Sequence, residues 1–341
     1  MADLERYSRQ MRFAPIGAAG QERLGASGAL IVGMGALGAV LASHMVRSGV
    51  GLVRFADRDY VEKSNLQRQM LYDEDDAEAG LPKAVAAERK LSRINSGVRL
   101  EPVVADVTGA NAEALLDGVD IVLDGTDNFR TRLLLNDACY KHGKPFVYGG
   151  AVSSQGMTAV FVPGETSCLR CLIGSDPDGG GETCDTIGVV SPIVDIVASF
   201  QAIEALKLLV GASEARRRSL LSLEIWRHQL FDMKLPPSKL DCPTCGAAGS
   251  RRYPSLDAAE SETTTLCGRE TVQVRASKPF DLERLAERLA PVCALERNPF
   301  LLRATLPEGE RLVLFPDGRT LVQGTEDVAR AKSLYDRYVG G

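Results

Sequence analysis

The chain has 341 residues, of which 45% are hydrophobic and 25% charged, and its formal net charge is −5. This length suits about two domains with a well-buried core, and the composition is that of a globular protein rather than a disordered one. The slight acidic excess gives no reason to expect nucleic acid as a partner. The polar first residues, MADLERYSRQ, do not resemble a secretory signal, so we expect a cytoplasmic protein.

The first predicted elements lie in an uncharged run, 28–46, which is about long enough to span a membrane. Its glycines, and its change from β-branched residues to Ala and Leu, instead favour a buried strand at 29–33 and a helix at about 36–48. We therefore expect no membrane association.

The turn between this strand and helix, in IVGMGALG (31–38), has the pattern of a nucleotide-binding turn. Gly33, Gly35 and Gly38, with Ala36 between them, match G-x-G-x-x-G. Asp57 follows at about the spacing of a ribose-binding carboxylate. The motif alone leaves open whether the ligand is NAD or another phosphate compound.

Strands and helices then alternate through the first half of the chain. We predict strands at 52–57, 99–107, 119–126 and 144–152, and a helix at 82–94 opened by Pro82. This alternation predicts an α/β fold with a Rossmann-like, doubly wound, mostly parallel sheet.

Four acidic residues fall at or just after the predicted strand ends. They are Asp57, Asp59, Asp124 and Asp127. Since ligands of such sheets bind beyond the carboxyl ends of the strands, we expect these groups to line one crevice.

The second half begins with a glycine-rich loop at 175–183 and a helix that opens at Ser191-Pro192 and is closed by Gly211. Residues 220–235 alternate enough to form one or two antiparallel strands, an antiparallel extension of the sheet. We thus predict one domain over 1–246.

A polar stretch follows this domain, and we predict a linker over 247–265. Residues 266–341 are predicted to form a small α+β C-terminal domain. It would contain a hairpin at FPDG (315–318) and a final helix over 326–338.

Four of the eight cysteines form two C-x-x-C pairs, Cys168/Cys171 and Cys242/Cys245. Two such knuckles are the usual way to place four thiolates around zinc, whereas a redox role is the competing interpretation. Two copies, the second shaped as a turn by Pro243 and Gly246, favour structural zinc. A site closed by four protein ligands leaves no position for a substrate.

Several cations are predicted near the glycine turn. Lys83 falls in the first turn of a helix, where the macrodipole disfavours a cation unless an anion lies nearby, although a solvated surface lysine is the alternative. The segment SNLQRQ (64–69) is rich in side-chain donors, and Arg68 suits bidentate phosphate contact. Arg9 is a further candidate.

A glycine turn, acidic strand ends and several cations suit a nucleoside triphosphate with Mg²⁺ better than a hydride-transfer site. The sequence also resembles the HesA/MoeB/ThiF family, the bacterial relatives of ubiquitin-activating enzymes. The matching segments follow family order and cover about residues 5–246: RYSRQ (6–10), IVGMGALG (31–38), ADRDYVEKSNLQRQ (56–69), LPK (81–83), LDGTDN (123–128), both cysteine pairs and ETCDTIGVVSP (182–192).

The resemblance implies an adenylyltransferase that uses MgATP to activate the C-terminal carboxylate of a ubiquitin-like sulfur-carrier protein ending in Gly-Gly. It also implies a homodimer, because Arg9 matches an arginine that reaches the ATP of the neighbouring subunit. The four paired cysteines match zinc ligands. In the implied nucleotide site, Asp57 binds the ribose, Asn65, Arg68 and Lys83 contact the phosphates, and Asp127 holds magnesium with Asn128 beside it. The other implied nucleotide-binding residues are Gly33, Gly35, Ala36 and Gly38 of the turn, Asp59 close to the pocket, and Ser64, Leu66 and Gln67.

Cys184, in ETCDT, matches a cysteine that in some family members links covalently to the carrier. The alternative is a loop cysteine without chemistry, and the flanking acidic residues would raise rather than lower its pKa. Residues 266–341 lie outside the shared core and carry no rhodanese-like loop around Cys267 or Cys293. A sulfur donor, a cysteine desulfurase or rhodanese, would therefore be another protein.

Two other functions stay open on the sequence. An NAD-dependent oxidoreductase would share the glycine turn but leaves SNLQRQ and Lys83 without a role. A non-catalytic regulator that only binds the carrier would be expected to lack the phosphate-site residues, which are present here. The pathway that the carrier serves, thiamin thiazole, molybdopterin or another thiolation, is also open, with a slight preference for a ThiF-like role.

Overall fold

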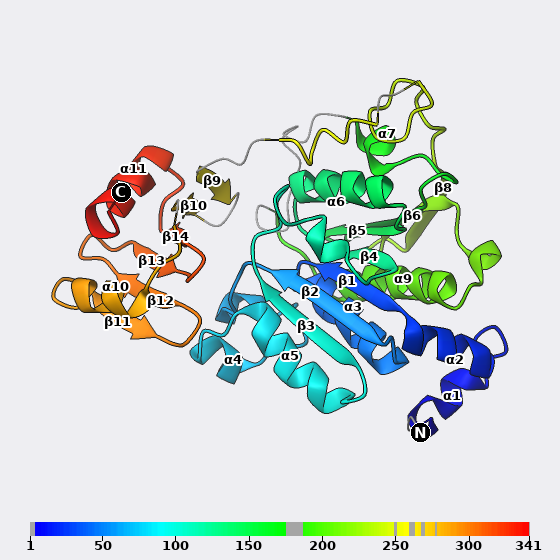
Figure 1. Cartoon of the computed structure of the whole chain (residues 1–341), viewed down its shortest axis with the longest axis horizontal. Helices are drawn as coiled ribbons and strands as arrows, with labels where there is room; N and C mark the ends of the chain where they lie inside the picture. Colours follow the sequence, from blue (N-terminus) through cyan, green and yellow to red (C-terminus); the bar gives the residue numbers. More distant parts are fainter. Residues whose placement is uncertain are drawn as a thin grey trace. The chain divides into compact units, whose positions relative to one another are not determined.

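The protein is described here by a computed structural model that covers residues 4–174, 187–248, 251–258, 263–266, 270–276 and 278–340. The chain divides into two compact units (Figure 1). The larger comprises Met1–Glu78, Pro82–Cys184 and Gly188–Ala258, and the smaller comprises Ala79–Leu81, Asp185–Ile187 and Ala259–Gly341.

The larger unit is built on an eight-stranded sheet with the order β3-β2-β1-β4-β5-β6-β7-β8. The strands are β1 (Gly28–Val32), β2 (Leu52–Asp57), β3 (Arg99–Val104), β4 (Ile121–Asp124), β5 (Phe146–Val152), β6 (Gln155–Phe161), β7 (Ser219–Glu224) and β8 (Gln229–Lys234). The five strands from β3 to β5 are parallel, and β6, β7 and β8 extend the sheet antiparallel. This confirms the predicted α/β fold class.

Helices cover both faces of this sheet, as a doubly wound fold requires (Figure 1). Helices α3, α5 and α9 pack on one face, while α6 packs on the other. The helices of the larger unit are α1 (Ser8–Met11), α2 (Gly17–Ala26), α3 (Ala36–Ser48), α4 (Glu74–Glu78), α5 (Lys83–Ile94), α6 (Phe129–His142), α7 (Leu169–Ile173) and α9 (Ser191–Leu209).

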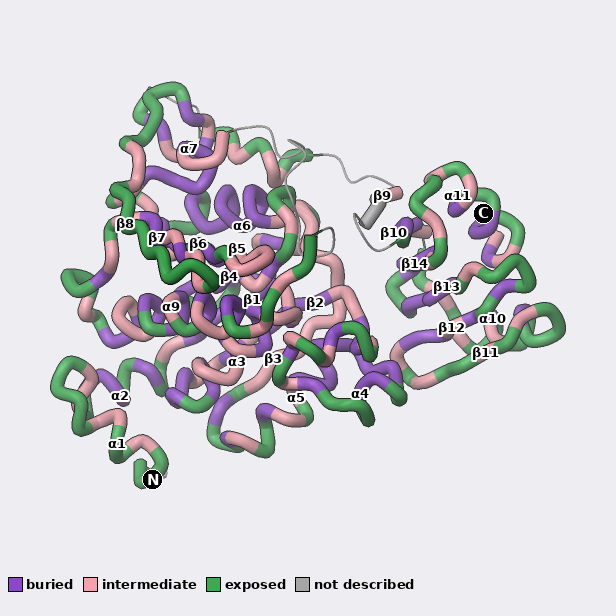
Figure 2. Tube along the Cα trace, turned by 180° about the vertical axis from the view of Figure 1, so that it is seen from behind, coloured by how far each residue is buried: buried purple, intermediate pink, exposed green. Residues whose placement is uncertain are grey.

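The central strand β1 is buried along its whole length because it has a parallel neighbour on each side and a helix layer on each face. The outermost strand β8 is exposed throughout, as the green trace in Figure 2 shows. The core of the α6 face contains Leu30 and Val32 of β1, Leu135 and Ala138 of α6, and the cysteine knuckles. The glycine turn thus begins at the centre of the sheet, directly after β1. The two cysteine pairs lie on the face of the sheet that α6 covers.

Part of the segment expected to be a linker belongs to the larger unit. Tyr253 and Leu256 pack against the core of the α6 face, and the backbone N–H of Ser255 donates a hydrogen bond to Asp137 at 2.9 Å. Further along, β9 (Thr263–Leu266) pairs antiparallel with the strand that follows it.

The smaller unit is a six-stranded antiparallel sheet with the order β11-β12-β13-β14-β10-β9. Two helices join its strands in a single hydrophobic core, and each begins at an aspartate, Asp281 or Asp327, that caps two backbone N–H groups. The expected FPDG turn connects β13 to β14. The elements after β9 are β10 (Thr271–Arg275), α10 (Leu282–Leu289), β11 (Ala294–Arg297), β12 (Leu302–Thr305), β13 (Arg311–Leu314), β14 (Arg319–Gln323) and α11 (Val328–Tyr338).

Within the described part of the chain, no helix is both long enough and apolar enough to cross a bilayer. The uncharged run 28–46 is accounted for by β1, the glycine turn and most of α3.

Candidate functional site: a nucleotide turn and a four-cysteine cluster

The turn from β1 into α3 is a close crossing of two backbones. Gly33 has φ of +86°, and a Cβ on it would lie 2.5 Å from the carbonyl oxygen of Gly125, in the loop after β4. A Cβ on Gly38 would lie 1.8 Å from the carbonyl oxygen of Gly33. Side chains are therefore excluded at both positions, as the glycine motif predicts.

Gly35 is different, because a Cβ there would meet no backbone atom within 4 Å among the described residues. It is the N-cap residue of the 13-residue helix α3, and no side chain in the described chain caps that end. A Cβ on Gly35 would have one neighbour within 4 Å among the described residues, the Nε2 atom of Gln69 at 3.7 Å. The first N–H groups of α3 thus point into a space that suits an anion, favoured further by the helix dipole.

Gln69 is a further candidate for the site, in addition to the residues predicted from the sequence. It is 4% exposed, and its Oε1 atom has no hydrogen-bond partner among the described residues. Buried amides are normally paired, so this side chain is suited to meet a ligand. The only signal in the sequence was its place at the end of SNLQRQ, the donor-rich segment.

Asp57, at the end of β2, holds the turn in place. One carboxylate oxygen accepts a hydrogen bond from the backbone N–H of Met34 and the other accepts one from the N–H of Asp59, both at 2.6 Å. Burial raises the pKa of Asp57, while the nearby Lys83 ammonium and these two N–H groups act in the opposite direction. Each oxygen keeps further acceptor capacity for a ribose hydroxyl.

Lys83 is buried beside the acidic strand end. It is the first residue of α5, is 3% exposed, and its Nζ lies 3.3 Å from Oδ2 of Asp59. The hydroxyl of Tyr72 donates to the carbonyl of Met34 at 2.7 Å and lies 3.2 Å from that of Lys83, which links α5 to the glycine turn. The structure therefore brings the lysine and the turn together, and a solvated surface lysine is excluded.

The segment around Asn65 forms a short 3₁₀ turn, Lys63–Asn65. The side chain of Asn65 is buried and accepts a hydrogen bond from the N–H of Glu62 at 3.2 Å. Arg68 is half-buried and donates to the carbonyl of Ser64 at 3.1 Å. Of the other two predicted residues, Leu66 is half-buried and Gln67 is exposed.

The loop after β4 carries the predicted magnesium ligand. Asp127 is exposed, and its Oδ1 lies 3.2 Å from the amide nitrogen of Asn128. Asn128 is the N-cap of α6 and accepts a hydrogen bond from the N–H of Thr131 at 2.9 Å. The cap fixes the direction in which the loop enters the helix.

One of the four acidic strand-end residues does not line the crevice. Asp124 is 0% exposed and forms an ion pair with Arg132 of α6, with Oδ2 and Nε 3.0 Å apart. Arg132 also donates to the carbonyls of Thr126 and Gly149. The expectation that Asp124 lines a crevice was therefore wrong. The strand-end position predicts an exposed carboxylate, but Arg132 of α6 covers it and neutralises its charge.

Arg9 lies away from these groups within its own chain. Its neighbours anchor the N-terminal segment to the C-terminal end of α3, since Gln10 donates to the carbonyl of Ser48 at 3.0 Å and the hydroxyl of Tyr7 accepts from Asn95. The nucleotide turn is at the other end of α3, about 20 Å away for 13 residues at about 1.5 Å each. Arg9 itself is exposed.

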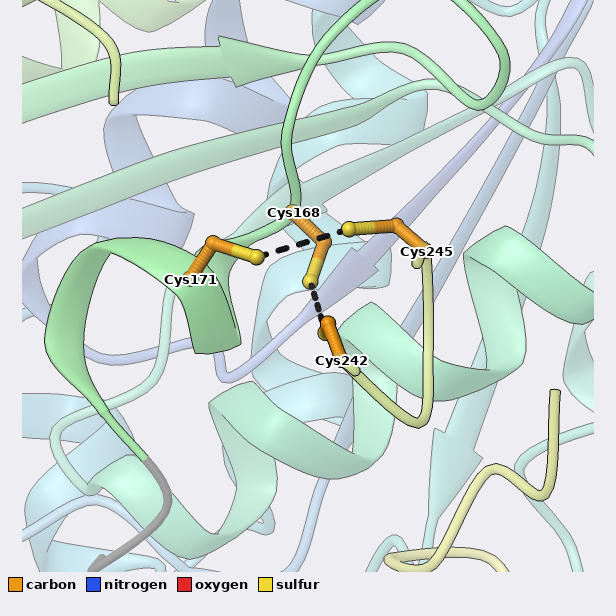
Figure 3. Close-up of side chains that lie close together, drawn as sticks. All are labelled: Cys168, Cys171, Cys242 and Cys245. Carbon is orange, nitrogen blue, oxygen red and sulfur yellow. Dashed lines mark hydrogen bonds between the residues drawn. The ribbon is translucent and has the colours of Figure 1, made fainter. Parts of the chain in front are cut away.

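The four paired cysteines converge on one point (Figure 3). Their sulfurs all lie within 4.8 Å of one another, with Cys168 and Cys242 at 3.7 Å and Cys171 and Cys245 at 3.5 Å. Four sulfurs about 2.3 Å from a tetrahedral zinc ion would lie about 3.8 Å apart. Donor type, number and spacing therefore fit a metal ion such as zinc, and residues more than 70 positions apart share the site.

Cys184 lies outside the described residues, as does the glycine-rich loop 175–183.

Comparison with known families now bears on these two sites. The model of the ThiF family matches residues 7–244, which include the nucleotide turn, Lys83, Asp127 and three of the four clustered cysteines. The chain belongs to the ThiF family. This confirms the family to which the sequence motifs pointed.

Two curated relatives are similar over much of the chain. The sulfur carrier protein ThiS adenylyltransferase of Bacillus subtilis (strain 168) is 47% identical over 340 residues, which cover 98% of this chain and 99% of that protein. The SAMP-activating enzyme E1 of Haloferax volcanii is 38% identical over 259 residues, covering 76% of this chain and 94% of the relative. The first alignment therefore includes the smaller unit. The second covers 94% of the archaeal protein, and the unaligned remainder is too short for a counterpart of the smaller unit.

Solved structures share the fold. Escherichia coli MccB, solved with MccA-N7isoASN, superposes with a TM-score of 0.62 at 21% identity, covering 71% of this chain and 74% of that one. PaaA superposes with a TM-score of 0.59 at 24% identity, covering 68% of this chain and 73% of that one. At this identity the likeness shows a shared fold.

Proposed function

We propose that this protein uses ATP to adenylylate the C-terminal carboxylate of a small sulfur-carrier protein that ends in Gly-Gly. The observation that carries the proposal is the convergence, in a ThiF-family chain, of an uncapped helix terminus at Gly35 with the buried ammonium of Lys83 and the acidic end of β2. The curated relatives named as adenylyltransferases of sulfur carriers support it.

The reaction requires little acid–base catalysis by the protein. A carrier carboxylate oxygen forms a bond to the α-phosphorus of ATP, and the bond between that phosphorus and the β-phosphate bridging oxygen breaks. Pyrophosphate leaves with the electron pair, and the carrier retains an acyl-adenylate. Because the attacking carboxylate is already ionised at neutral pH, positioning and charge neutralisation supply most of the catalysis.

The site residues divide this work. Phosphate oxygens are bound by the N–H groups at the start of α3 and by the cations Lys83 and Arg68. Asn65 assists Arg68, and the remaining residues of this nucleotide-binding segment are Ser64, Leu66 and Gln67. Asp57 binds the ribose. Asp127, next to Asn128, provides carboxylate oxygens for Mg²⁺, which when bound neutralises phosphate charge.

We further propose that the active protein is a homodimer whose sites are completed in trans. Arg9 is held at the end of α3 remote from the nucleotide turn, so it cannot serve its own chain without releasing the contacts of Gln10 and Tyr7. In a twofold dimer the same arginine can reach the partner's site, and the relation is reciprocal. Arg9 would then neutralise phosphate charge there.

We assign Zn²⁺ to the four-cysteine cluster, with an architectural role. Four thiolates saturate a tetrahedral ion, so no position remains for substrate. Thiolates of this kind, and the demand for ATP, are consistent with a cytoplasmic protein.

For the carrier we propose a ThiS-type protein, which serves formation of the thiamin thiazole. Support comes from the alignment that extends over both units with the adenylyltransferase named for ThiS. Sulfur would come from a separate donor, a cysteine desulfurase or a rhodanese. Cys184 would attack the acyl-adenylate carbonyl through its thiolate and expel AMP, leaving the carrier joined to the enzyme by a thioester.

Intact mass spectrometry of the carrier tests the adenylation directly. Incubation with the enzyme, ATP and Mg²⁺ should add one adenylyl group to the carrier, and added pyrophosphate should remove it. A carrier lacking its last glycine should stay unmodified. An unchanged mass for every Gly-Gly carrier of the source genome would refute the proposal.

A further inference from the structure

Asp137 is a buried carboxylate on α6 that faces the cysteine cluster. It is 0% exposed, and the mechanism above gives it no role. Its partners come from three segments far apart in sequence: α6 itself, the first cysteine knuckle and the stretch that contains the second knuckle and Ser255.

The two carboxylate oxygens divide these partners between them. Oδ1 accepts from the hydroxyl of Thr244 at 2.6 Å and from the amide of Asn136 at 3.2 Å. Oδ2 accepts from Nη2 of Arg170 at 2.8 Å and from the backbone N–H of Ser255 at 2.9 Å. Four donors therefore meet one carboxylate, which satisfies its full acceptor capacity.

Two of these donors stand inside the C-x-x-C motifs. Arg170 precedes Cys171 in the first knuckle and Thr244 precedes Cys245 in the second, and Nε of Arg170 also donates to the hydroxyl of Thr244 at 3.2 Å. Asn136 completes the arrangement, since its Oδ1 accepts from the backbone N–H that follows Cys168, at 2.8 Å. The spacer residues of both knuckles are thus tied to each other and to α6.

We propose that Asp137 is the positioning residue of the metal centre. Its carboxylate holds the two knuckles at the spacing that a tetrahedral ion requires, and it does so through hydrogen bonds that are independent of the metal. The proposal concerns this chain's Cys₄ cluster and rests on that cluster binding a metal ion, not on the adenylation chemistry.

The physical reason is the cost of joining distant segments. The knuckles lie 74 positions apart, and the pairing of β6, β7 and β8 brings their chain segments together, but each knuckle lies several residues beyond its strand and must still be ordered at a cost in conformational entropy. With Asp137 in place those residues are already ordered, so metal binding orders little additional chain. Conversely, release of the metal requires the knuckles to separate, which the Asp137 contacts oppose.

The test is metal release from the full-length protein loaded with Co²⁺, whose thiolate charge-transfer absorption reports occupancy of this cluster. A chelator in excess removes the ion, and the loss of absorbance gives the rate. In Asp137→Asn an amide NH₂ replaces one oxygen and faces two donors. We expect release at least about tenfold faster than from the wild type, in the range that outer-sphere partners of metal sites contribute.

A matched control is Asp124→Asn, which breaks an equally buried aspartate–arginine pair between the end of β4 and Arg132 of α6, away from the cysteines. It should release Co²⁺ at the wild-type rate. Thr244→Val, which removes one donor and keeps the carboxylate, should accelerate release by a smaller factor and serves if Asp137→Asn does not fold.

Equal acceleration in Asp137→Asn and Asp124→Asn would overturn the proposal, because it would reflect general loss of stability. Wild-type release from both Asp137→Asn and Thr244→Val would also overturn it. So would a wild-type protein that gives no Co²⁺–thiolate absorption. Since adenylation is not measured, failure of the proposed function leaves this test intact.

Discussion

The Nζ atom of Lys83 lies 3.3 Å from Oδ2 of Asp59, and the lysine side chain is almost completely buried. This pair joins the start of α5 to the end of β2, beside the glycine turn. A buried ammonium with one carboxylate partner is suited to receive a second anion, which is the arrangement that phosphate binding needs.

Replacing Lys83 by Met should lower the rate of carrier adenylation by about 10²–10³-fold, the usual loss for one donor to developing charge. It should also destabilise the fold by about 3 kcal/mol, since the buried ion pair between Lys83 and Asp59 is lost. The double variant Lys83→Met/Asp59→Asn separates the two effects. Its free energy of unfolding should recover while the rate stays low; recovery of the rate would contradict the assignment of Lys83 to the phosphates.

Two of the three glycines of the turn, Gly38 and Gly35, should respond differently to an added methyl group. Gly38→Ala places a Cβ 1.8 Å from a backbone oxygen and should cost about 3 kcal/mol or more in unfolding free energy. In Gly35→Ala the Cβ makes only an ordinary van der Waals contact, 3.7 Å from Nε2 of Gln69, so the protein should keep its stability. It should bind ATP about tenfold more weakly, because the methyl group enters the space proposed for the phosphates. Thermal unfolding and calorimetric titration with ATP measure these effects, and normal ATP affinity in Gly35→Ala would count against a ligand at α3.

Arg9 should act on the partner's site. The Arg9→Ala and Asp127→Ala variants should each be inactive alone. When the two variants are mixed and allowed to exchange subunits, the mixture should regain up to about one quarter of the wild-type rate. Half of the dimers would then be mixed, and each of these would have one intact site. Mixing wild type with Asp127→Ala is the control. No recovery, with subunit exchange verified, would show that Arg9 does not complete a site in trans.

Removal of the metal should affect stability and spare nucleotide binding. The cysteine cluster lies beneath α6, with no substrate position among its ligands, so Cys242→Ser should lower the melting temperature without changing the affinity for ATP. Elemental analysis should find about one zinc ion per wild-type chain. A variant that keeps its stability but loses ATP affinity would point to a direct role of the metal in the site.

Cys184→Ala should leave adenylation intact and abolish any covalent enzyme–carrier adduct. A thiol acts only after the acyl-adenylate has formed, so the two steps separate in this variant. Non-reducing gel electrophoresis and intact mass of the enzyme measure the adduct. An adduct that persists in Cys184→Ala would remove the covalent role from this residue.

Local patterns in the sequence were sufficient for much of the fold. The strand predicted at 52–57 has those bounds as β2, and the helix predicted at about 36–48 is α3. The burial of both elements matches their apolar residues, and α3 is bounded by Gly35 as its N-cap and by Gly49 after its last residue. At such positions local preference and tertiary packing agree.

Contacts between distant segments were beyond the sequence. The alternation of strands predicts Asp124 at a strand end, but only the folded chain shows that Arg132 of α6 reaches it. The polar stretch after 246 resembles a linker, yet Ser255 is bound to Asp137, a partner 118 positions away. Likewise, only the folded chain shows that the amide oxygen of Gln69 has no hydrogen-bond partner among the described residues.

Exchange of radiolabelled pyrophosphate into ATP measures the reversal of carrier adenylation by this protein. The full-length protein with Mg²⁺ should catalyse this exchange when a Gly-Gly carrier from the source genome is added, and should give none without carrier or with a carrier lacking its last glycine. Absence of exchange with every such carrier, from a protein shown by calorimetry to bind ATP, would contradict the account.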